Sequence, residues 1–278
     1  ISQLKVAKNK YKMNNLCISG GVGLNCTLNG KIVQEGIFDE VFVVPPSGDA
    51  GTTVGGCYLG LKFLGNDIEI RARHNFYLGS RFSNTEIEKS LKDFNVDYRK
   101  SKNIFTETAS LLAEGSIIGW FQGGAEFGPR ALGNRSILTR PYPSEMKDTI
   151  NSRVKFREEF RPFAPAVMVE NYRQYFNLDQ ESPHMLIAVQ ANKDKNDSIS
   201  STVHIDGSAR VQTVSKEINE KFWLLINAFN SLTDVPVLLN TSFNVKGQPI
   251  VNDPDDAIKT FLSTNIDVLV IGDFILQK

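Results

Sequence analysis

Cysteine is scarce in this sequence. Only three of its 278 residues are cysteines, Cys17, Cys26 and Cys57, and no two of them have CxxC spacing. An odd number without that spacing excludes a disulfide framework and a zinc site built on paired cysteines. We interpret the three as buried or incidental thiols in a reducing compartment, and we therefore expect a cytoplasmic protein.

The sequence also lacks an excess of either charge, and it lacks a long apolar run. Lys plus Arg and Asp plus Glu both total 31. DNA and anionic membranes are normally bound by a basic surface, so this balance argues against both as partners. The longest apolar stretches, such as 267–276, are too short to span a bilayer, and no charged-then-apolar leader opens the chain. Any anion site must therefore be local.

Length and composition suggest two domains. At roughly 100 to 200 residues per domain, 278 residues correspond to two domains, or to one large domain with an appendage. Hydrophobic residues make up 41% of the chain, enough for a packed core. The first residue is Ile1 rather than a methionine, and the opening segment reads as the end of a helix that leads into a strand. We expect the sequence to be a fragment.

Residues 1–64 alternate between predicted strands and helices. A short strand at 15–19 runs into two glycines, after which apolar residues recur at helical spacing. A second buried strand at 38–44 ends at two prolines, and the loop SGDAG and a helix of small residues follow. This order is an α/β pattern. The polar stretch 65–75 is the predicted domain boundary.

The remaining residues are predicted to form a mixed α+β domain whose strand order cannot be read from spacing. Predicted helices lie at 83–93, 105–114, 144–154, 216–231 and 254–263. Predicted strands lie at 116–122, 164–169, 184–189, 235–239 and 267–271.

A run between residues 123 and 165 sets six arginines and Lys155 among glycines and prolines. The guanidinium group pairs bidentately with carboxylate or phosphate, so arginines this close together suggest a phosphate-bearing ligand. Glu158 and Glu159 could instead neutralise part of the run as a solvated ion-pair face, and charge alone favours that interpretation. The run contains Arg130, Arg135, Arg140, Arg153, Lys155, Arg157 and Arg161.

Two glycine turns in the first part could also contact a ligand. The segment ISGGVGLNCTLNGKI places Gly20 and Gly21 where a strand meets a helix, where backbone N–H groups suit a nucleotide phosphate. Many such turns need glycine only for a positive φ, so this signal is weak alone. The second turn, PPSGDAGTTVGG, carries Asp49, which could coordinate a metal or hold a ribose, although capping a helix is the commoner use.

In order and spacing, the two turns resemble the second half of the actin-like and sugar-kinase-like ATPase fold found in tRNA threonylcarbamoyl-transferring proteins. The resemblance implies that Gly20, Gly21 and Asn25 contact the nucleotide, and that Asp49 binds a divalent metal, iron, in the full-length enzyme. The other metal ligands of that fold are a histidine pair at i and i+4. The three histidines here, His74, His184 and His204, are far apart in sequence, so we expect the metal site to be incomplete.

Four further motifs, GGAEFGPRALGNRSIL, KFREEFRPFAP, HIDGSARVQTV and VLLNTSFNVKGQPI, follow in order. With the two glycine turns, they resemble the C-terminal half of the O-carbamoyltransferase family that includes nodulation protein NodU and the tobramycin and cephamycin carbamoyltransferases. The resemblance spans essentially the whole chain. Four ordered motifs are much more specific than any one of them.

This resemblance implies that residues 1–68 are the truncated end of an ATPase-like transfer domain and that residues 69–278 form a YrdC-like domain. The YrdC-like fold marks an ATP-binding cavity with K-x-R and S-x-N. Here these motifs are Lys155, Phe156 and Arg157, and Ser242, Phe243 and Asn244.

The family implies a two-stage reaction. Carbamoyl phosphate and ATP, the latter with Mg²⁺, give carbamoyl adenylate, and the ATPase-like site then passes the carbamoyl group to an acceptor hydroxyl on a sugar or an antibiotic-like molecule. The identity of the acceptor is beyond reach, and a homodimer is compatible with this scheme.

Adenylate formation requires fixed positive charges, and the sequence offers several candidates for them. An adenylate forms when a carboxylate-type oxygen attacks the α-phosphorus of ATP, which brings two anions together and develops charge on pyrophosphate. Fixed cations stabilise that encounter. The candidates are Arg130, Lys155, Arg161 and Arg210, and neutral donors could come from Asn240 and Ser242, at the end of the apolar strand VPVLL.

Each candidate has a structural alternative. Arg135 and Arg140 could pair with Glu145 or Asp148, Asn240 could cap a turn, and His204 could be a core histidine. Trp120 and Phe121 are expected to pack a core strand rather than to stack on adenine.

The alternative function is a nucleotide- or RNA-binding YrdC-like module without transferase activity. The balanced net charge argues against RNA as its ligand, because an RNA-binding protein normally carries a basic face. A third interpretation is that this fragment can at most make the adenylate.

Overall fold

The computed structural model describes residues 1–67, 75–156 and 163–278. The first part begins with α1 (Ser2–Tyr11) and β1 (Asn15–Ile18), followed by a 3₁₀ helix, η1 (Gly21–Leu24), and α2 (Cys26–Gln34). Then come β2 (Glu40–Val43) and α3 (Asp49–Phe63). Strands β1 and β2 pair in parallel and form a small sheet of their own. The predicted alternation of strand, glycine turn and helix is confirmed.

The second part is built on a nine-stranded mixed sheet of order β3-β11-β10-β4-β5-β9-β6-β8-β7. Its strands are β3 (Arg99–Lys100), β4 (Ile118–Phe121), β5 (Arg135–Thr139), β6 (Ala164–Met168), β7 (Ile187–Gln190), β8 (Ser208–Val214), β9 (Val237–Ser242), β10 (Val268–Ile271) and β11 (Phe274–Gln277). Its helices are α4 (Asn84–Asp93), α5 (Ile104–Glu114), α6 (Met146–Ile150), a π-helix η2 (Asn151–Lys155), α7 (Tyr172–Tyr175), a 3₁₀ segment η3 (Lys193–Thr202), α8 (Glu220–Thr233) and α9 (Pro254–Ser263).

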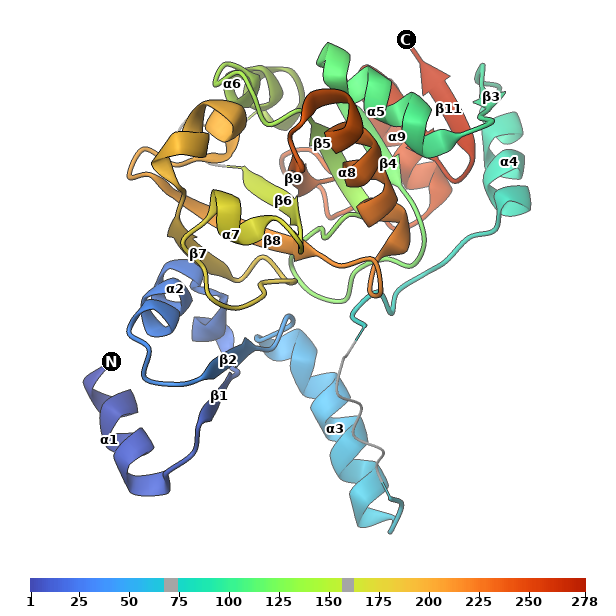
Figure 1. The fold of residues 1–278 in the computed structure, drawn as a ribbon. Helices are drawn as coiled ribbons and strands as arrows, with labels where there is room; N and C mark the ends of the chain where they lie inside the picture. Colours follow the sequence, from blue (N-terminus) through green and yellow to red (C-terminus); the bar gives the residue numbers. More distant parts are fainter. Residues whose placement is uncertain (68–74, 157–162) are drawn as a thin grey trace.

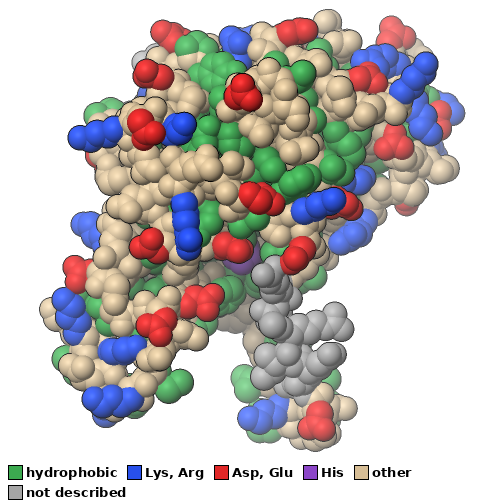
Figure 2. Space-filling model, viewed as in Figure 1, with side chains coloured by type: hydrophobic (Ala, Val, Ile, Leu, Met, Phe, Trp, Pro, Cys, Tyr) green, Lys and Arg blue, Asp and Glu red, His purple; other side chains and the backbone are tan. Residues whose placement is uncertain are grey.

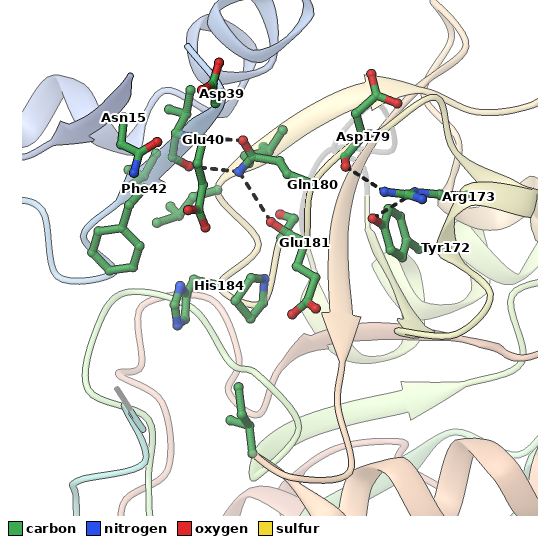
Figure 3. A pocket seen from close by; sticks show the side chains of 17 residues that line it. Asn15, Asp39, Glu40, Phe42, Tyr172, Arg173, Asp179, Gln180, Glu181 and His184 are labelled. Atoms are coloured by element: carbon green, nitrogen blue, oxygen red, sulfur yellow. Dashed lines mark hydrogen bonds between the residues drawn. The ribbon is translucent and has the colours of Figure 1, made fainter. Parts of the chain in front are cut away.

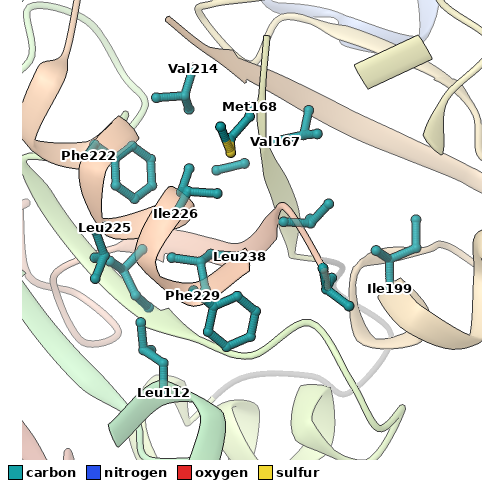
Figure 4. Packing of buried hydrophobic residues seen from close by; sticks show 14 of the residues in the cluster. Leu112, Val167, Met168, Ile199, Val214, Phe222, Leu225, Ile226, Phe229 and Leu238 are labelled. Carbon is teal, nitrogen blue, oxygen red and sulfur yellow. The ribbon is translucent and has the colours of Figure 1, made fainter. Parts of the chain in front are cut away.

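Both faces of this sheet are covered by helices, because its central strands alternate apolar side chains between two separate cores. Ile118 and Trp120 of β4 belong to the core under α5 and α8, two helices that are labelled in Figure 1, and part of this core is drawn in Figure 4. Phe121 of the same strand belongs to the opposite core, under α4 and α9. Adjacent residues on a strand point to opposite faces, so this division follows directly from the pleat.

The mixed α/β class predicted from the sequence is confirmed, but β3, β5, β8 and β11 were not predicted, and β5 is the central strand of the sheet. Strand β5 lies inside the arginine run, between β4 and β9, and all five of its residues are buried. Charge alone favoured the interpretation of the run as a solvated ion-pair face. Half of it is instead interior, because β5 begins with an arginine whose charge hid the strand pattern.

The first part packs against the β7 end of the large sheet through α2. Gly30 of α2 approaches so closely that a Cβ there would lie 1.8 Å from the carbonyl oxygen of Ala188. Asn29, fully buried, donates from Nδ2 to the carbonyls of Gly23 (2.8 Å) and Leu186 (2.9 Å). The predicted boundary after residue 68 lies outside the described residues, and the division into two domains stays a prediction.

The Gln180 side chain adds a second connection between the two parts. Its Oε1 accepts from the backbone N–H of Val41 (3.0 Å), and its Nε2 donates to the carbonyl of the same residue (2.8 Å). Helix α3 extends away from the rest of the molecule (Figure 1), and none of its residues is buried. No helix in the described parts combines the length and apolar character needed to cross a membrane.

Candidate functional site

Lys155, Ser242 and Asn244 meet in the structure. Lys155 is the last residue of η2, and Phe156, in the left-handed conformation at φ 47°, ends that helix. The lysine side chain is buried, and its ammonium donates to the carbonyl and hydroxyl of Ser242 and to the carbonyl and Oδ1 (both 2.9 Å) of Asn244. Two motifs that are about ninety residues apart in the chain, K-x-R and S-x-N, are therefore in contact.

These contacts orient the ammonium. The four acceptors from Ser242 and Asn244 are neutral oxygens, and the Ser242 hydroxyl also donates to Asn244 Oδ1 at 2.6 Å. The side chains of both motifs are thereby held together around one buried ammonium group.

Asn240 on β9 and Gln212 on β8 form a second buried group across β6, the strand that lies between them. Asn240 donates from Nδ2 to Gln212 Oε1 (2.8 Å) and to the carbonyl of Ala131 (3.3 Å), and Gln212 donates to the carbonyl of Leu132 (2.8 Å). The alternative that Asn240 caps a turn is therefore wrong, because it lies inside β9 and holds the 131–132 loop. Its Oδ1 is buried and has no hydrogen-bond partner within the described residues.

The loop between β4 and β5 is shaped by Glu126, which the sequence reasoning missed. One carboxylate oxygen, Oε1, accepts three backbone N–H groups, those of Leu132 (2.7 Å), Asn134 (2.8 Å) and Arg135 (3.2 Å). Backbone N–H groups that converge on one point form an anion site, and the Glu126 carboxylate occupies this one. The signal that could have revealed this is a single acid inside the glycine-rich segment GGAEFGPRALG.

Arg135 has a structural role. Its guanidinium is fully buried, donates to the carbonyls of Gln122 (2.6 Å), Asn134 (3.1 Å) and Ser80 (2.9 Å), and lies over the ring of Phe121 at 3.6 Å. Burial lowers the pKa of Arg135 to about 10, and the group remains protonated at neutral pH. The alternative pairing with Glu145 or Asp148 is wrong, because Arg135 points to backbone oxygens.

Two more arginines of the run are also occupied by the fold. Arg140 donates to the carbonyl of Ala113 (3.0 Å) rather than to Glu145 or Asp148, which corrects the predicted alternative. Arg153 pairs with Asp267 at 2.7 Å. Arg157 and Arg161, both expected at the site, lie outside the described residues and stay predictions.

Arg130 lies where the two parts of the chain meet. Burial lowers the pKa of its guanidinium, and the neighbouring Cys26 thiol, at the start of α2, acts in the opposite direction. Its Nε is buried without a hydrogen-bond partner in the described ranges. Gly128, two residues earlier, lies against Pro45. Arg130 therefore lies near the start of α2, whereas Lys155 contacts the S-x-N segment.

Arg210 lies on β8 opposite Ala188, the residue against which α2 packs. It precedes Gln212 by two residues, so both side chains project from the same face of that strand. Arg210 thus lies on the same strand face as Gln212, beside the strand that α2 contacts. The expectation that Arg210 contacts the ligand together with the LNTSFN segment stays a prediction.

The two glycine turns of the first part are adjacent. Gly20 has φ 94°, which favours glycine, and its N–H donates to the carbonyl of Ser47 at 2.8 Å. Gly21 begins η1, and Asn25 caps α2 by accepting from Leu28 N–H at 3.0 Å. The predicted contact of Gly20, Gly21 and Asn25 with a nucleotide stays a prediction, and Asn25 has at least this structural role.

The predicted metal ligand Asp49 is exposed at the first position of α3, where Gly48 is the N-cap. The alternative that Asp49 caps the helix by itself is therefore wrong, although its charge stabilises the first turn. Within residues 1–67, 75–156 and 163–278, no group of three or more His, Cys, Asp or Glu side chains could hold a metal ion. One exposed carboxylate does not provide a binding site for iron.

A separate cavity of about 590 Å³ opens between β2 and the segment 179–187 (Figure 3). Four carboxylates, Asp39, Glu40, Asp179 and Glu181, are among its lining residues. Of the described residues that line it, none is a predicted site residue. On the face drawn in Figure 2, Lys and Arg are interspersed with Asp and Glu.

Sequence comparison identifies the family to which this chain belongs. The profile described as "Carbamoyltransferase C-terminus" matches residues 109–278, and the profile described as "Carbamoyltransferase N-terminus" matches residues 1–58. The chain belongs to the carbamoyltransferase family. The resemblance drawn from the ordered motifs is thereby confirmed.

Relatives in this family include two nodulation proteins and an antibiotic-modifying enzyme. Nodulation protein NolO of Bradyrhizobium diazoefficiens is 43% identical over 96% of this chain and 50% of its own length. Nodulation protein NolNO of Sinorhizobium fredii is 42% identical over 96% and 40%. The 3'-hydroxymethylcephem-O-carbamoyltransferase of Streptomyces clavuligerus is 36% identical over 93% and 48%. The chain spans about half the length of the curated relatives it matches.

Among solved structures, HypF of T. kodakarensis is similar to 58% of this chain and 20% of its own chain, with 16% identity and a TM-score of 0.40. A similarity this low adds nothing to the description of the fold.

Proposed function

We propose that this chain carries the adenylate-forming part of an ATP-dependent O-carbamoyltransferase. Residues 69–278 act as a YrdC-like domain that makes carbamoyl adenylate from carbamoyl phosphate and ATP. Residues 1–68 are part of an ATPase-like domain that passes the carbamoyl group to an acceptor hydroxyl. The observation that carries the proposal is the contact of Lys155 with Ser242 and Asn244.

The chemistry requires cations at the point where two anions meet. Loss of phosphate from carbamoyl phosphate by hydrolysis leaves carbamate, whose oxygen attacks the α-phosphorus of ATP and displaces pyrophosphate. In this proposal Lys155 lies beside the phosphates, and Arg130 and Arg210 bind further phosphate oxygens through their guanidinium forks. Arg157 and Arg161 belong to the same site, and ATP brings Mg²⁺ as its counter-ion. The acceptor is a sugar or an antibiotic-like hydroxyl compound.

Isothermal titration with ATP and with carbamoyl phosphate tests the proposed site. We expect Lys155→Ala and Arg130→Ala each to weaken binding by roughly 1.5–3 kcal/mol, the value of a charge-assisted contact. Arg153→Ala is the matched control, because it also removes one positive charge but its partner is Asp267 at the surface. Undiminished binding in the Lys155 and Arg130 variants, or no binding to the folded wild-type chain, would refute the site.

The two stages can be separated in one assay. Pyrophosphate release reports the adenylate step, whereas carbamoylation of an added hydroxyl compound reports the transfer step. We expect this chain to release pyrophosphate without completing the transfer, because the described residues contain no group of three or more His, Cys, Asp or Glu side chains that could hold a metal ion. Pyrophosphate release that needs neither Lys155 nor carbamoyl phosphate would count against the proposal.

The alternative of an RNA-binding module has less support. Charges of both signs are mixed on the face shown in Figure 2, whereas an RNA-binding surface is normally basic. A fluorescence titration with tRNA at two salt concentrations distinguishes the two functions. Tight, salt-sensitive binding without any carbamoyl phosphate-dependent pyrophosphate release would favour the alternative.

A further inference from the structure

His204 lies in a tight turn that joins η3 to β8. Its carbonyl accepts from Gly207 N–H (3.0 Å), and its own N–H donates to the carbonyl of Ser208 (2.8 Å). Gly207 has φ 79°, a conformation that favours glycine. The position of the imidazole is therefore fixed by the backbone on both sides of the turn.

Hydrogen bonds within this turn also fix the tautomer of the imidazole. The Ser208 hydroxyl lies 2.7 Å from Asp206 Oδ1 and 3.1 Å from His204 Nδ1. A carboxylate only accepts, so the single hydroxyl hydrogen points to Asp206, and the serine oxygen accepts from Nδ1–H. The second ring nitrogen, Nε2, is left with a lone pair and acts as an acceptor.

That acceptor is enclosed and next to positive charge. His204 Nε2 is buried, and the described residues supply no hydrogen-bond partner for it. Burial lowers the pKa of His204; Asp206 opposes this effect, and Arg210 and Lys147 lower the pKa further. The ring is therefore neutral at neutral pH, and the lone pair of Nε2 is available beside two cations.

We propose that His204 Nε2 accepts a hydrogen bond from the amide N–H of the carbamoyl group, and so selects carbamoyl phosphate over acyl phosphates that have no N–H. This inference rests on the proposed function. It assigns to His204 a contact with substrate and to Ser208 the positioning of the correct tautomer.

The chemistry of the ligand matches this arrangement. Carbamoyl phosphate carries an N–H donor close to a phosphate group. The donor suits the Nε2 acceptor, and the phosphate suits the positive charges of Arg210 and Lys147 that act on His204. The amino group of adenine is also a donor, but it lies far from the phosphates of ATP. Acetyl phosphate has the same shape with a methyl group instead of the NH₂ group, and would leave Nε2 buried without a partner. Sites with an unsatisfied buried polar group reject such analogues strongly.

Two phosphonates that resist hydrolysis provide the test. Phosphonoacetamide keeps the amide, and acetonylphosphonate replaces its NH₂ with CH₃. Isothermal titration of the 278-residue chain should show phosphonoacetamide binding about tenfold more tightly than acetonylphosphonate. In His204→Leu that preference should fall to about one, and in His204→Gln, whose amide oxygen can accept, most of it should return.

Two further variants keep the test decisive. Ser208→Ala removes the hydrogen bond that fixes the tautomer of His204. It should therefore reduce the preference for phosphonoacetamide over acetonylphosphonate, although the serine does not contact the ligand. Ile205→Ala changes the same turn at a side chain that is 95% exposed, and should leave the preference unchanged.

The outcomes separate this inference from the proposed function. An undiminished preference in folded His204→Leu, or in Ser208→Ala if the leucine variant does not fold, overturns the role of His204 alone. Failure of the wild-type chain to bind phosphonoacetamide and ATP overturns the proposed function, and this inference with it. A variant whose ATP affinity is unchanged while the preference is lost supports the inference.

Discussion

Arg135 shows how a charged residue can serve the fold rather than a ligand. It is the only arginine among the side chains that the structure describes as fully buried, and it bonds to backbone carbonyls on three separate segments. We expect Arg135→Met to lower the free energy of unfolding by about 3 kcal/mol or more, because the buried carbonyls lose their donors. Urea denaturation measures this, with Arg173→Met at an exposed site as control. A loss below about 1 kcal/mol would contradict this role.

His184 should make stability depend on pH. It lies between the rings of Phe42 (6.2 Å) and Phe76 (5.0 Å), and burial lowers its pKa from 6.5 to about 4. The unfolded chain therefore takes up a proton between these values, and the contribution of His184 is present above pH 6.5 and lost as the pH falls to about 4. At its largest it is about 3 kcal/mol.

Melting temperatures measured from pH 4 to pH 8 test this expectation. The wild-type chain should lose stability between pH 6.5 and pH 4 more steeply than His184→Leu, which keeps an apolar side chain between the rings. Parallel curves for the two proteins would show that the histidine is accessible to solvent in the folded state.

Single residues also show what the sequence could and could not predict. The contact of Lys155 with Ser242 and Asn244 follows from motifs, because both are short and have a fixed internal spacing. The roles of Arg135, Arg140 and Arg153 could not be predicted, because their partners are backbone carbonyls or an aspartate more than a hundred residues away. Charge density identifies a candidate, but only the fold shows which charges are already satisfied.

At the scale of elements, α2 is joined to the large sheet through a glycine. In an exposed helix Gly→Ala stabilises by up to about 1 kcal/mol, but a methyl group on Gly30 would meet the carbonyl of Ala188. We expect Gly30→Ala to destabilise the protein by about 1–3 kcal/mol through overpacking. Thermal unfolding measures the effect.

Gly55 of α3 is the matched control for this prediction. It is also helical and glycine, but a Cβ there meets nothing within 4 Å. Gly55→Ala should therefore raise helical content or leave stability unchanged. Equal effects of the two substitutions would show that α2 does not pack closely against β7.

Helices and strands with a clear hydrophobic periodicity or a clear capping signal were predicted well, whereas strands in which polar residues interrupt the apolar ones were not. The helix predicted at 254–263 coincides with α9, because an Asp cap and Pro at its start mark the boundary. The strand predicted at 184–189 begins three residues later in the structure, because the carbonyl of Leu186 accepts a hydrogen bond from the Asn29 side chain instead of from a strand. Strand β8 was missed because polar Arg210 and Gln212 interrupt its apolar residues.

At the scale of the whole molecule, α3 presents an apolar surface to solvent. Phe63 and Leu64 are 88% and 80% exposed, and Leu59 is 58% exposed. Exposed apolar patches of this kind promote association. We expect the chain to self-associate at high concentration, and the double variant Leu59→Lys, Phe63→Lys to reduce this association without lowering the melting temperature.

Light scattering across a concentration series checks this prediction. Thr53→Lys adds a charge to the same helix without removing an apolar side chain, and should change association less than the double variant does. If the double variant and the wild-type chain scatter alike, the surface of α3 is not the site of association.

The small sheet has one edge that is already closed. Both backbone groups of Val41 that point away from β1 are bonded to the Gln180 side chain, whose amide occupies the place of a neighbouring peptide. The Gln180 amide therefore makes the two hydrogen bonds with Val41 that a residue of a neighbouring strand would make. A further strand beside β2 would have to displace Gln180 from Val41, and replacing Gln180 by alanine would leave these two backbone groups open to pairing with another chain.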